Sequence, residues 1–185
     1  MIAPNAILRA AKPGPRRFSK GPSPFLAYAM PWVAIMLASC VPLWPVIASA
    51  PVMPPFGFLM LLGWRQLRPG LLPVWAGTVL GLFDDAVSGQ PMGSAILLWS
   101  LTMLALDVIE ARFPWRNFLT EWVVAAAMIL AYVLLGVGIA NAAGGSTPVV
   151  VVAPQIVLSV LVYPLVGRMV AMLDRMRLRR YRVRR

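Results

Sequence analysis

The acidic side chains have the clearest capacity for chemistry in this sequence, and there are only six of them. Asp84 and Asp85 are adjacent, while Asp107 and Glu110 lie three positions apart. Paired carboxylates can act as a general acid and base, as a proton relay or as ion-pair partners. Which of these roles applies depends on what surrounds each acid.

Several reaction classes are excluded by composition. The sequence has no histidine, and Cys40 is its only cysteine. It therefore lacks a Ser–His–Asp triad, an HExxH zinc site, a disulfide within the chain and a cysteine cage for zinc or iron–sulfur. The acid pair is preceded by G-L-F, without the GxGD motif of intramembrane aspartyl proteases, and no D-G-x-x-A-R string of CDP-alcohol phosphatidyltransferases occurs. We expect no enzymatic activity, no cofactor and no metal.

The composition is that of a membrane protein. Of the 185 residues, 60% are hydrophobic and 12% are charged, with a net charge of +11, whereas an average soluble domain is about 25% charged. A globule of this size still exposes about a third of its unfolded surface. So many apolar residues cannot all be hidden in one small core, and the elements that position the acids are expected to be membrane helices.

Two long charge-free runs predict paired membrane spans. Residues 21–64 and 122–167 carry no charge, and about 20 helical residues cross the ~30 Å hydrocarbon core. Each run should therefore fold back once, at the Pro-rich stretch Pro45–Pro55 and at the Gly-containing stretch Asn141–Pro148. We predict an all-α integral membrane protein with about six transmembrane helices at 25–46, 52–67, 71–88, 91–111, 118–140 and 149–173.

The basic residues predict the orientation. All 17 Lys and Arg fall in four segments that an inside N-terminus would place on the cytoplasmic side: 1–24, 65–70, 112–117 and the end from Arg168. Such an asymmetry follows the positive-inside rule, so both termini are expected in the cytoplasm. The chain is divided accordingly into a basic N-terminal tail (1–24), a six-helix transmembrane domain (25–173) and an Arg-rich C-terminal tail (174–185).

Two further sequence features are a string that resembles a signal-peptidase site and a basic C-terminus. Ala48-Ser49-Ala50 resembles a signal-peptidase site, but the apolar stretch before it exceeds the usual h-region and cleavage would leave an odd number of spans. We expect no cleavage.

The second feature is the basic C-terminus. In a soluble protein, a high isoelectric point would indicate nucleic-acid binding. Beside a membrane, it indicates binding to anionic lipid. The expected lipid-anchoring residues are Arg175, Arg177, Arg179, Arg180 and Arg182.

The stretch from Gly77 to Gly93 predicts a locked helical hairpin. Gly77 and Gly81 form a GxxxG step that permits close helix approach, and Asp85 lies one turn further on the same face. A carboxylate at its own helix C-terminus is unfavourable, but free N–H groups at the start of the next helix favour it. We expect Asp85, rather than Asp84, to accept hydrogen bonds from N–H groups around residues 92–94. The alternative is a solvated interfacial acid pair without a specific partner.

Turn residues support this hairpin. Gly89 is expected to supply the turn, and Pro91 suits a first helical position because its missing N–H leaves no bond unmade. We treat Gly77, Gly81, Asp85, Gly89, Pro91 and Gly93 as a candidate structural or partner-binding set.

The second acid pair has two interpretations. Asp107 and Glu110 lie at the inner end of the fourth predicted helix, with Arg112 and Arg116 just beyond. They are either a proton relay or interhelical ion pair, or interfacial acids that pair loosely with these arginines at well under 1 kcal/mol each. The sequence favours the loose pairing.

The string from Gly81 to Gly93, G-L-F-D-D-A-V-S-G-Q-P-M-G, resembles the G-L-x-x-D-x-x-x-G-x-P-L-G signature of the rod shape-determining protein MreD family. Gly81, Asp85, Gly89, Pro91 and Gly93 match it, Met92 replaces the usual Leu, and Asp84 is additional. The resemblance covers residues 27–175 and is similar in style to alphaproteobacterial members.

This resemblance implies a multi-pass protein of the bacterial inner membrane without catalytic activity of its own. The implied role is a scaffold in the cell-elongation complex, which regulates cell shape. The implied partners are a bitopic MreC-like protein, the filament protein MreB, the glycosyltransferase RodA and a class B penicillin-binding transpeptidase. The implied fold is similar to the six-helix substrate-binding components of energy-coupling-factor transporters.

That fold similarity leaves an alternative, a vitamin-like small-molecule transport component. Such a protein needs polar groups that converge on a ligand near the outer face. The predicted outer loops 45–55 and 141–148 hold only Asn141 as an amide, so they offer few groups for a polar ligand. The scaffold interpretation is favoured.

Overall fold

The computed structural model of the chain describes residues 24–43, 53–113 and 117–178. Within these ranges the protein is helical and has no strand. The elements are α1 (Pro24–Ser39), the short 3₁₀ turn η1 (Val41–Leu43), α2 (Phe56–Leu67), α3 (Ala76–Ser88), α4 (Ser94–Arg112), α5 (Phe118–Ala142), the 3₁₀ turn η2 (Val149–Val152) and α6 (Ala153–Leu178). The six predicted helices are therefore confirmed as elements, with changed boundaries.

Prolines account for two boundary corrections. The first helix ends at Ser39 rather than at residue 46, because Pro42 lacks the N–H that a helix interior requires; Pro42 lies in η1. The third helix begins at Ala76 rather than at residue 71, after a turn in which the N–H of Ala76 bonds to the carbonyl of Pro73. The turn expected at Pro45–Pro55 lies mostly outside the described residues, as does Ala48–Ala50.

Only part of the predicted set has the length of a full membrane span. In the described ranges, three helical segments are long and apolar enough to cross a bilayer: Ser94–Arg112, Phe118–Ala142 and Val149–Arg177. The segment Tyr28–Leu43 is apolar but shorter. With 12 and 13 residues, α2 and α3 extend about 18–20 Å at 1.5 Å per residue, which is less than the hydrocarbon thickness. The prediction of six complete spans is therefore too simple.

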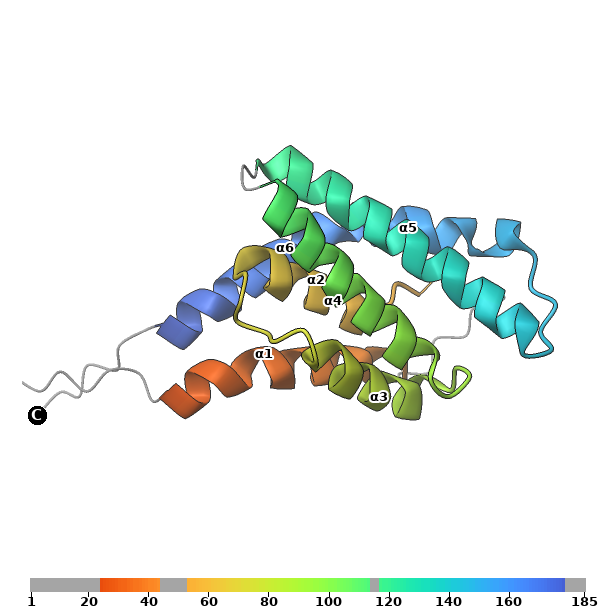
Figure 1. The fold of residues 1–185 in the computed structure, drawn as a ribbon, viewed down its shortest axis with the longest axis horizontal. Helices are drawn as coiled ribbons and strands as arrows, with labels where there is room; N and C mark the ends of the chain where they lie inside the picture. The colour runs from red at the N-terminus through yellow and green to blue at the C-terminus, as the bar shows by residue number, and fades with distance from the viewer. Residues whose placement is uncertain (1–23, 44–52, 114–116, 179–185) are drawn as a thin grey trace, which may run out of the picture.

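The shortest helix is the most buried one. Every residue of α2 from Gly57 to Gln66 is buried, and α2 packs against α1 and α6. Figure 1 shows α2 and α6 behind α4, with the α3–α4 hairpin at the front of the bundle. In the core, Phe58 of α2 stacks on Tyr132 of α5, with ring centroids 4.1 Å apart. A helix surrounded by other helices needs neither full length nor a lipid-facing side.

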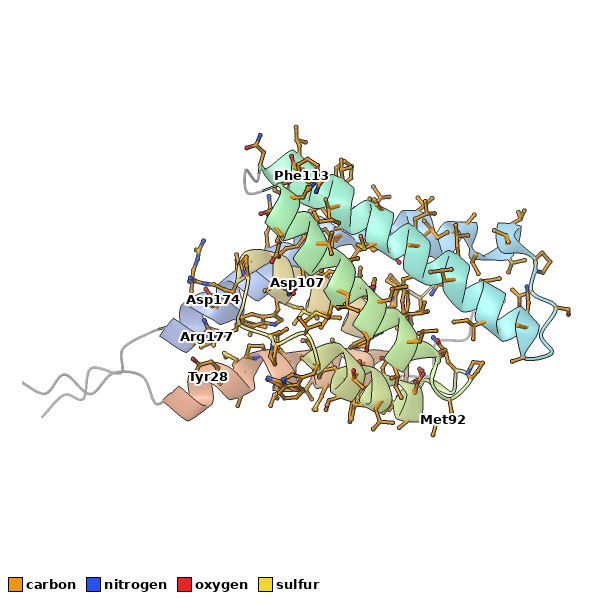
Figure 2. All side chains as sticks on the ribbon, viewed as in Figure 1. Tyr28, Met92, Asp107, Phe113, Asp174 and Arg177 are labelled. Carbon is orange, nitrogen blue, oxygen red and sulfur yellow. The ribbon has the colours of Figure 1, made fainter. Side chains whose placement is uncertain are left out.

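The bundle has two chemically different ends. At one end, here called the basic end, α1 begins and α4 and α6 end. The described arginines at this end include Arg65, Arg68, Arg112 and Arg177. The opposite end carries the α3–α4 turn (89–93) and the α5–α6 connection (143–148). Figure 2 shows Asp107, Asp174 and Arg177 toward the basic end and Met92 at the opposite end. The clustering agrees with the charge pattern of the sequence, whereas the side of the membrane that each end faces stays a prediction.

The outer surface of the long helices is apolar. On α4 the exposed large side chains recur at helical spacing, at Leu97, Leu101, Leu104 and Val108. The corresponding exposed set on α6 is Val157, Leu161, Leu165, Met169, Met172 and Met176. Apolar stripes of this kind suit contact with hydrocarbon or with other membrane helices.

Candidate functional site

The Asp85 carboxylate lies at the N-terminus of α4. Its Oδ1 accepts hydrogen bonds from the backbone N–H of Ala95 at 2.8 Å and the hydroxyl of Ser94 at 3.2 Å. Its Oδ2 accepts from the N–H groups of Gly93 at 2.9 Å and Ile96 at 3.2 Å. The Asp85 residue is only 3% exposed.

This arrangement confirms that Asp85 accepts hydrogen bonds from the start of α4, although the donors extend to residue 96 rather than ending at 94. The first N–H groups of a helix have no partner within it, and the helix dipole favours an anion there. A buried carboxylate with four donors is thus stabilised, while the same donors would otherwise be unsatisfied. The contact ties the end of α3 to the start of α4.

Two glycines with positive φ make the turn between these helices. Gly89 ends α3 with a φ of 67°, and Gly93 precedes α4 with a φ of 96°. A left-handed backbone is unfavourable for residues with a Cβ atom. Gly89 therefore supplies the turn as predicted. Pro91, however, is not the first helical residue: α4 begins at Ser94, whose N–H bonds to the Pro91 carbonyl.

The GxxxG step faces α4 of the same chain. A Cβ atom at Gly77 would lie 2.9 Å from the carbonyl oxygen of Trp99, and one at Gly81 would lie 2.7 Å from that of Ala95. These distances leave no room for a side chain, so the close approach predicted for this step occurs within the α3–α4 hairpin. The idea that this face packs against a partner helix is therefore wrong, because α4 already covers it.

The second acid pair surrounds a buried arginine. Arg65 of α2, 3% exposed, forms ion pairs with Asp107 and, at 2.9 Å, with Glu110, both on α4. Loose pairing of these acids with Arg112 and Arg116 is therefore the wrong interpretation, and the interhelical ion pair is the observed one; Arg116 lies outside the described residues. Spacing along α4 alone did not identify the partner, because Arg65 approaches from a helix 42 residues earlier.

A second charged cluster joins the α2–α3 connection to α6. Arg68 donates two hydrogen bonds to Asp174 Oδ2, from Nε at 3.0 Å and from Nη2 at 2.9 Å. Arg177 also pairs with Asp174, at 2.9 Å. The Arg177 guanidinium lies 5.9 Å from the centroid of the Trp64 ring, a distance compatible with a cation–π contact.

The C-terminal arginines therefore divide into two kinds. Arg177 has only 8% of its side chain exposed and is paired, so its assignment as a lipid anchor is wrong. Arg175 is exposed and keeps that role as a proposal. Helix α6 continues past Asp174 to Leu178, beyond the expected start of the tail. Arg179, Arg180 and Arg182 lie outside the described residues, as do residues 1–23.

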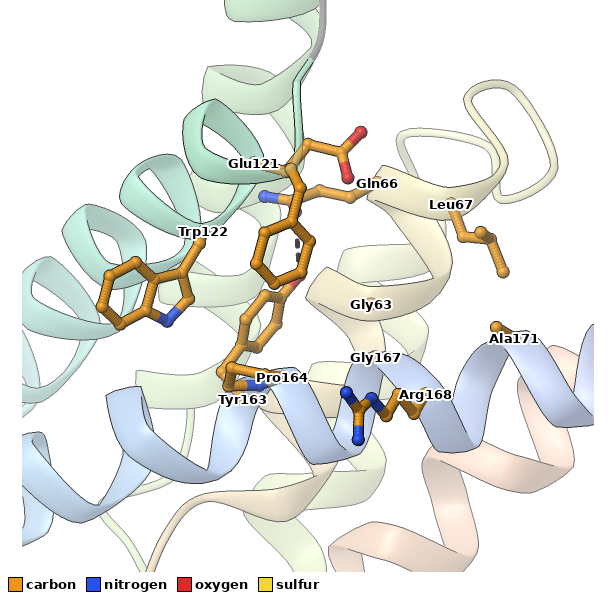
Figure 3. A pocket seen from close by; sticks show the side chains of 11 residues that line it. Gly63, Gln66, Leu67, Glu121, Trp122, Tyr163, Pro164, Gly167, Arg168 and Ala171 are labelled. Atoms are coloured by element: carbon orange, nitrogen blue, oxygen red, sulfur yellow. Dashed lines mark hydrogen bonds between the residues drawn. The ribbon is translucent and has the colours of Figure 1, made fainter.

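A pocket of about 260 Å³ opens near the basic end, between α2, the start of α5 and α6. Figure 3 shows the hydrogen bond that the hydroxyl of Tyr163 donates to Gln66, with the charged groups of Glu121 and Arg168 at the sides. The other lining residues are mostly apolar or glycine.

A cavity of about 210 Å³ at the opposite end was not foreseen. Its lining includes six polar side chains, from residues Ser39, Asp84, Ser88, Gln90, Tyr132 and Gln155. The predicted outer loops 45–55 and 141–148 contain few polar groups; the polar groups of the cavity come instead from helix ends, helix interiors and the α3–α4 turn. The adjacency of Asp84 to Asp85 was the one available signal. Across the described ranges no three His, Cys, Asp or Glu side chains form a group that could hold a metal.

These observations define an integral membrane helical bundle with internal charge pairs and a carboxylate-locked hairpin. The rod shape-determining protein MreD family model matches residues 24–176, and the chain belongs to this family. The match includes the whole hairpin, the cluster around Arg65 and the Arg68–Asp174 pair. No curated protein and no solved structure matches the chain.

Proposed function

We propose that this chain is a non-catalytic membrane scaffold of the bacterial cell-elongation complex. Membership of the MreD family implies a role in rod-shape determination, and this family match is the observation that carries the proposal. The finer role is to connect an MreC-like bitopic protein and MreB with the peptidoglycan synthases RodA and a class B penicillin-binding protein. The proposed location is the inner membrane, with both termini in the cytoplasm, in a protein of the alphaproteobacterial type.

The distribution of charge supports a scaffold. The buried Arg65 and the buried Asp174 each pair with an oppositely charged side chain from another part of the chain, and Asp85 is satisfied by α4. Such contacts hold helices in one arrangement, since a buried charge is stable only with its partner in place. A fixed arrangement suits a protein that presents surfaces to others.

The surfaces left for partners are apolar. Because the glycine face of α3 is covered by α4, the membrane helix of an MreC-like protein would pack on exposed apolar stripes such as that of α4. On the cytoplasmic side, Arg175 and the arginines beyond it would contact anionic lipid, where each basic residue gains about 1 kcal/mol. Neither family membership nor the comparisons favour transport, and we do not propose it.

Co-purification tests the scaffold role. The tagged chain is expressed from its own locus, extracted in a mild detergent and captured, and the bound proteins are identified by mass spectrometry. The scaffold role predicts enrichment of an MreC-like bitopic protein relative to capture of an unrelated tagged membrane protein. Enrichment of an ATPase pair without any elongation protein would contradict it.

A further inference from the structure

The cavity at the opposite end contains a buried carboxylate. Asp84 on α3 is 8% exposed and shares this cavity of about 210 Å³ with Ser39 of α1, which faces it. The other polar lining groups come from α3, the α3–α4 turn, α5 and α6, and the apolar part of the wall includes three prolines, from η1 and the stretch before α2. The cavity is smaller than the ~300–1,000 Å³ typical of pockets for drug-sized ligands, so it suits a group no larger than a lipid headgroup or a short amine.

Asp84 and Asp85 are adjacent but have different surroundings. Asp85 accepts four hydrogen bonds at the start of α4. Asp84 has no ion-pair partner within the described ranges, and the Ser39 hydroxyl faces it in the cavity. Ser39 is itself 2% exposed, and its hydroxyl oxygen has no partner that meets full hydrogen-bond geometry. A buried carboxylate without a compensating charge is costly.

The sequence provides no cation for this end of the bundle. No Lys or Arg occurs between Lys20 and Arg65, between Arg68 and Arg112, or between Arg116 and Arg168. All the residues that line the cavity lie within these three intervals, so no basic side chain is among them, and a compensating cation would be supplied by a bound group.

The geometry points to a binding site for a primary ammonium group, and we propose that Asp84 forms the ion pair with it. An ammonium group donates three hydrogen bonds from a compact charge. The cavity offers one carboxylate together with hydroxyl and amide oxygens, from Ser39, Ser88, Tyr132, Gln90 and Gln155. A metal ion is a poor match, since no group of three candidate ligands exists among the described residues.

Two sources supply this chemistry, a free short-chain amine and the headgroup of phosphatidylethanolamine. The purified full-length chain is tested with both. In detergent, thermal unfolding is followed with ethanolamine, with choline as a bulkier cation lacking N–H donors, and with ethylene glycol as the neutral analogue. In nanodiscs, phosphatidylethanolamine is compared with phosphatidylcholine at constant phosphatidylglycerol, and native mass spectrometry reports the retained lipid.

Stabilisation by ethanolamine above both analogues identifies a free amine as the ligand. Selective retention of phosphatidylethanolamine without an effect of ethanolamine identifies the lipid. In either case Asp84→Asn should weaken binding at least tenfold, and Tyr132→Phe, which keeps the stacking ring, should weaken it less. Glu121→Gln, which removes a carboxylate near the basic end, serves as the matched control and should bind normally.

The site assignment is overturned if neither ammonium source binds better than its analogue. That result is also expected if a side chain of a protein partner fills the cavity instead. The assignment is also overturned if Asp84→Asn binds ethanolamine or phosphatidylethanolamine as tightly as the unmodified chain. Asp84→Asn removes a buried charge, so this variant is expected to fold. Tyr132→Phe tests ligand binding at the same site with a second, independent substitution.

Discussion

The carboxylate of Asp85 accepts a hydrogen bond from the backbone N–H of Ala95 at 2.8 Å, across the turn that joins α3 to α4. This bond, with three others from the same helix start, satisfies an acid at the end of one helix with free donors at the beginning of the next. The Gly81–Gly93 string, which carries the family resemblance, thus also connects the end of α3 to the start of α4 through the Asp85 carboxylate.

Replacing Asp85 is expected to loosen the hairpin. Hydrogen bonds to charged groups contribute about 1.5–3 kcal/mol each, and Asp85 accepts four of them, so Asp85→Ala should lower the free energy of unfolding by at least about 3 kcal/mol. Asp85→Asn, which keeps one acceptor oxygen, should lose roughly half as much. Denaturant titration in detergent micelles measures both. Unchanged stability in both variants would refute the locking role.

Adding one methyl group at Gly81 is expected to separate α3 from α4. The new Cβ atom would lie 2.7 Å from the carbonyl oxygen of Ala95, and overpacking of this kind costs about 1–3 kcal/mol. Gly138→Ala is the matched control because no atom lies within 4 Å of its added Cβ. The control should be neutral or stabilising, since alanine favours helix by about 1 kcal/mol. Equal effects in the two variants would contradict the close packing.

Arg65 is expected to be essential for the basic end of the bundle. Arg65→Ala leaves Asp107 and Glu110 without the cation between them, and loss of one partner from a buried pair costs about 3–5 kcal/mol. Because the Asp107 side chain is 48% exposed, the lower end of that range applies. Arg112→Ala removes an exposed arginine from α4 and should change stability by less than about 0.5 kcal/mol. Similar thermal stability for both variants would count against the interpretation.

Arg175 and Arg177 are expected to act differently although they are two positions apart. Arg177→Ala should destabilise the fold, because Arg177 pairs with Asp174 and lies over Trp64. Arg175→Ala should leave stability unchanged and reduce the affinity for anionic vesicles, by about fivefold if about 1 kcal/mol of lipid attraction is lost. Thermal unfolding and vesicle flotation separate the two effects. A reversal of these roles would show that the assignment of the two arginines is mistaken.

Local patterns predicted the parts of the fold that depend on neighbouring residues. The distribution of charged and apolar residues located six helices, and the Gly81–Gly93 string predicted both the carboxylate contact and the turn at Gly89. The two hairpin features rest on residues within about a dozen positions of one another. Helix propensity, turn chemistry and the dipole at a helix end all act at this range.

Contacts between residues far apart in the sequence could not be predicted from such local patterns. Arg65 reaches α4 from a helix far upstream, and Arg68 reaches Asp174 across 106 positions, so spacing within one helix could not identify either partner. The GxxxG step was correctly expected to contact another helix, but only the folded hairpin shows that this helix is α4. Likewise, the residues that line the polar cavity come from five helices or their ends, so no pattern within a single segment predicts the cavity.

Cell shape after depletion tests the central claim, that this chain works as a rod-shape scaffold. The gene is placed under a repressible promoter in the rod-shaped bacterium that encodes it, and the ratio of cell length to width is measured by microscopy as the protein is lost. A scaffold role predicts cells that become round or swollen, and recovery of rods when the unmodified chain is restored. Cells that stay normal rods after clean deletion of the gene would contradict it.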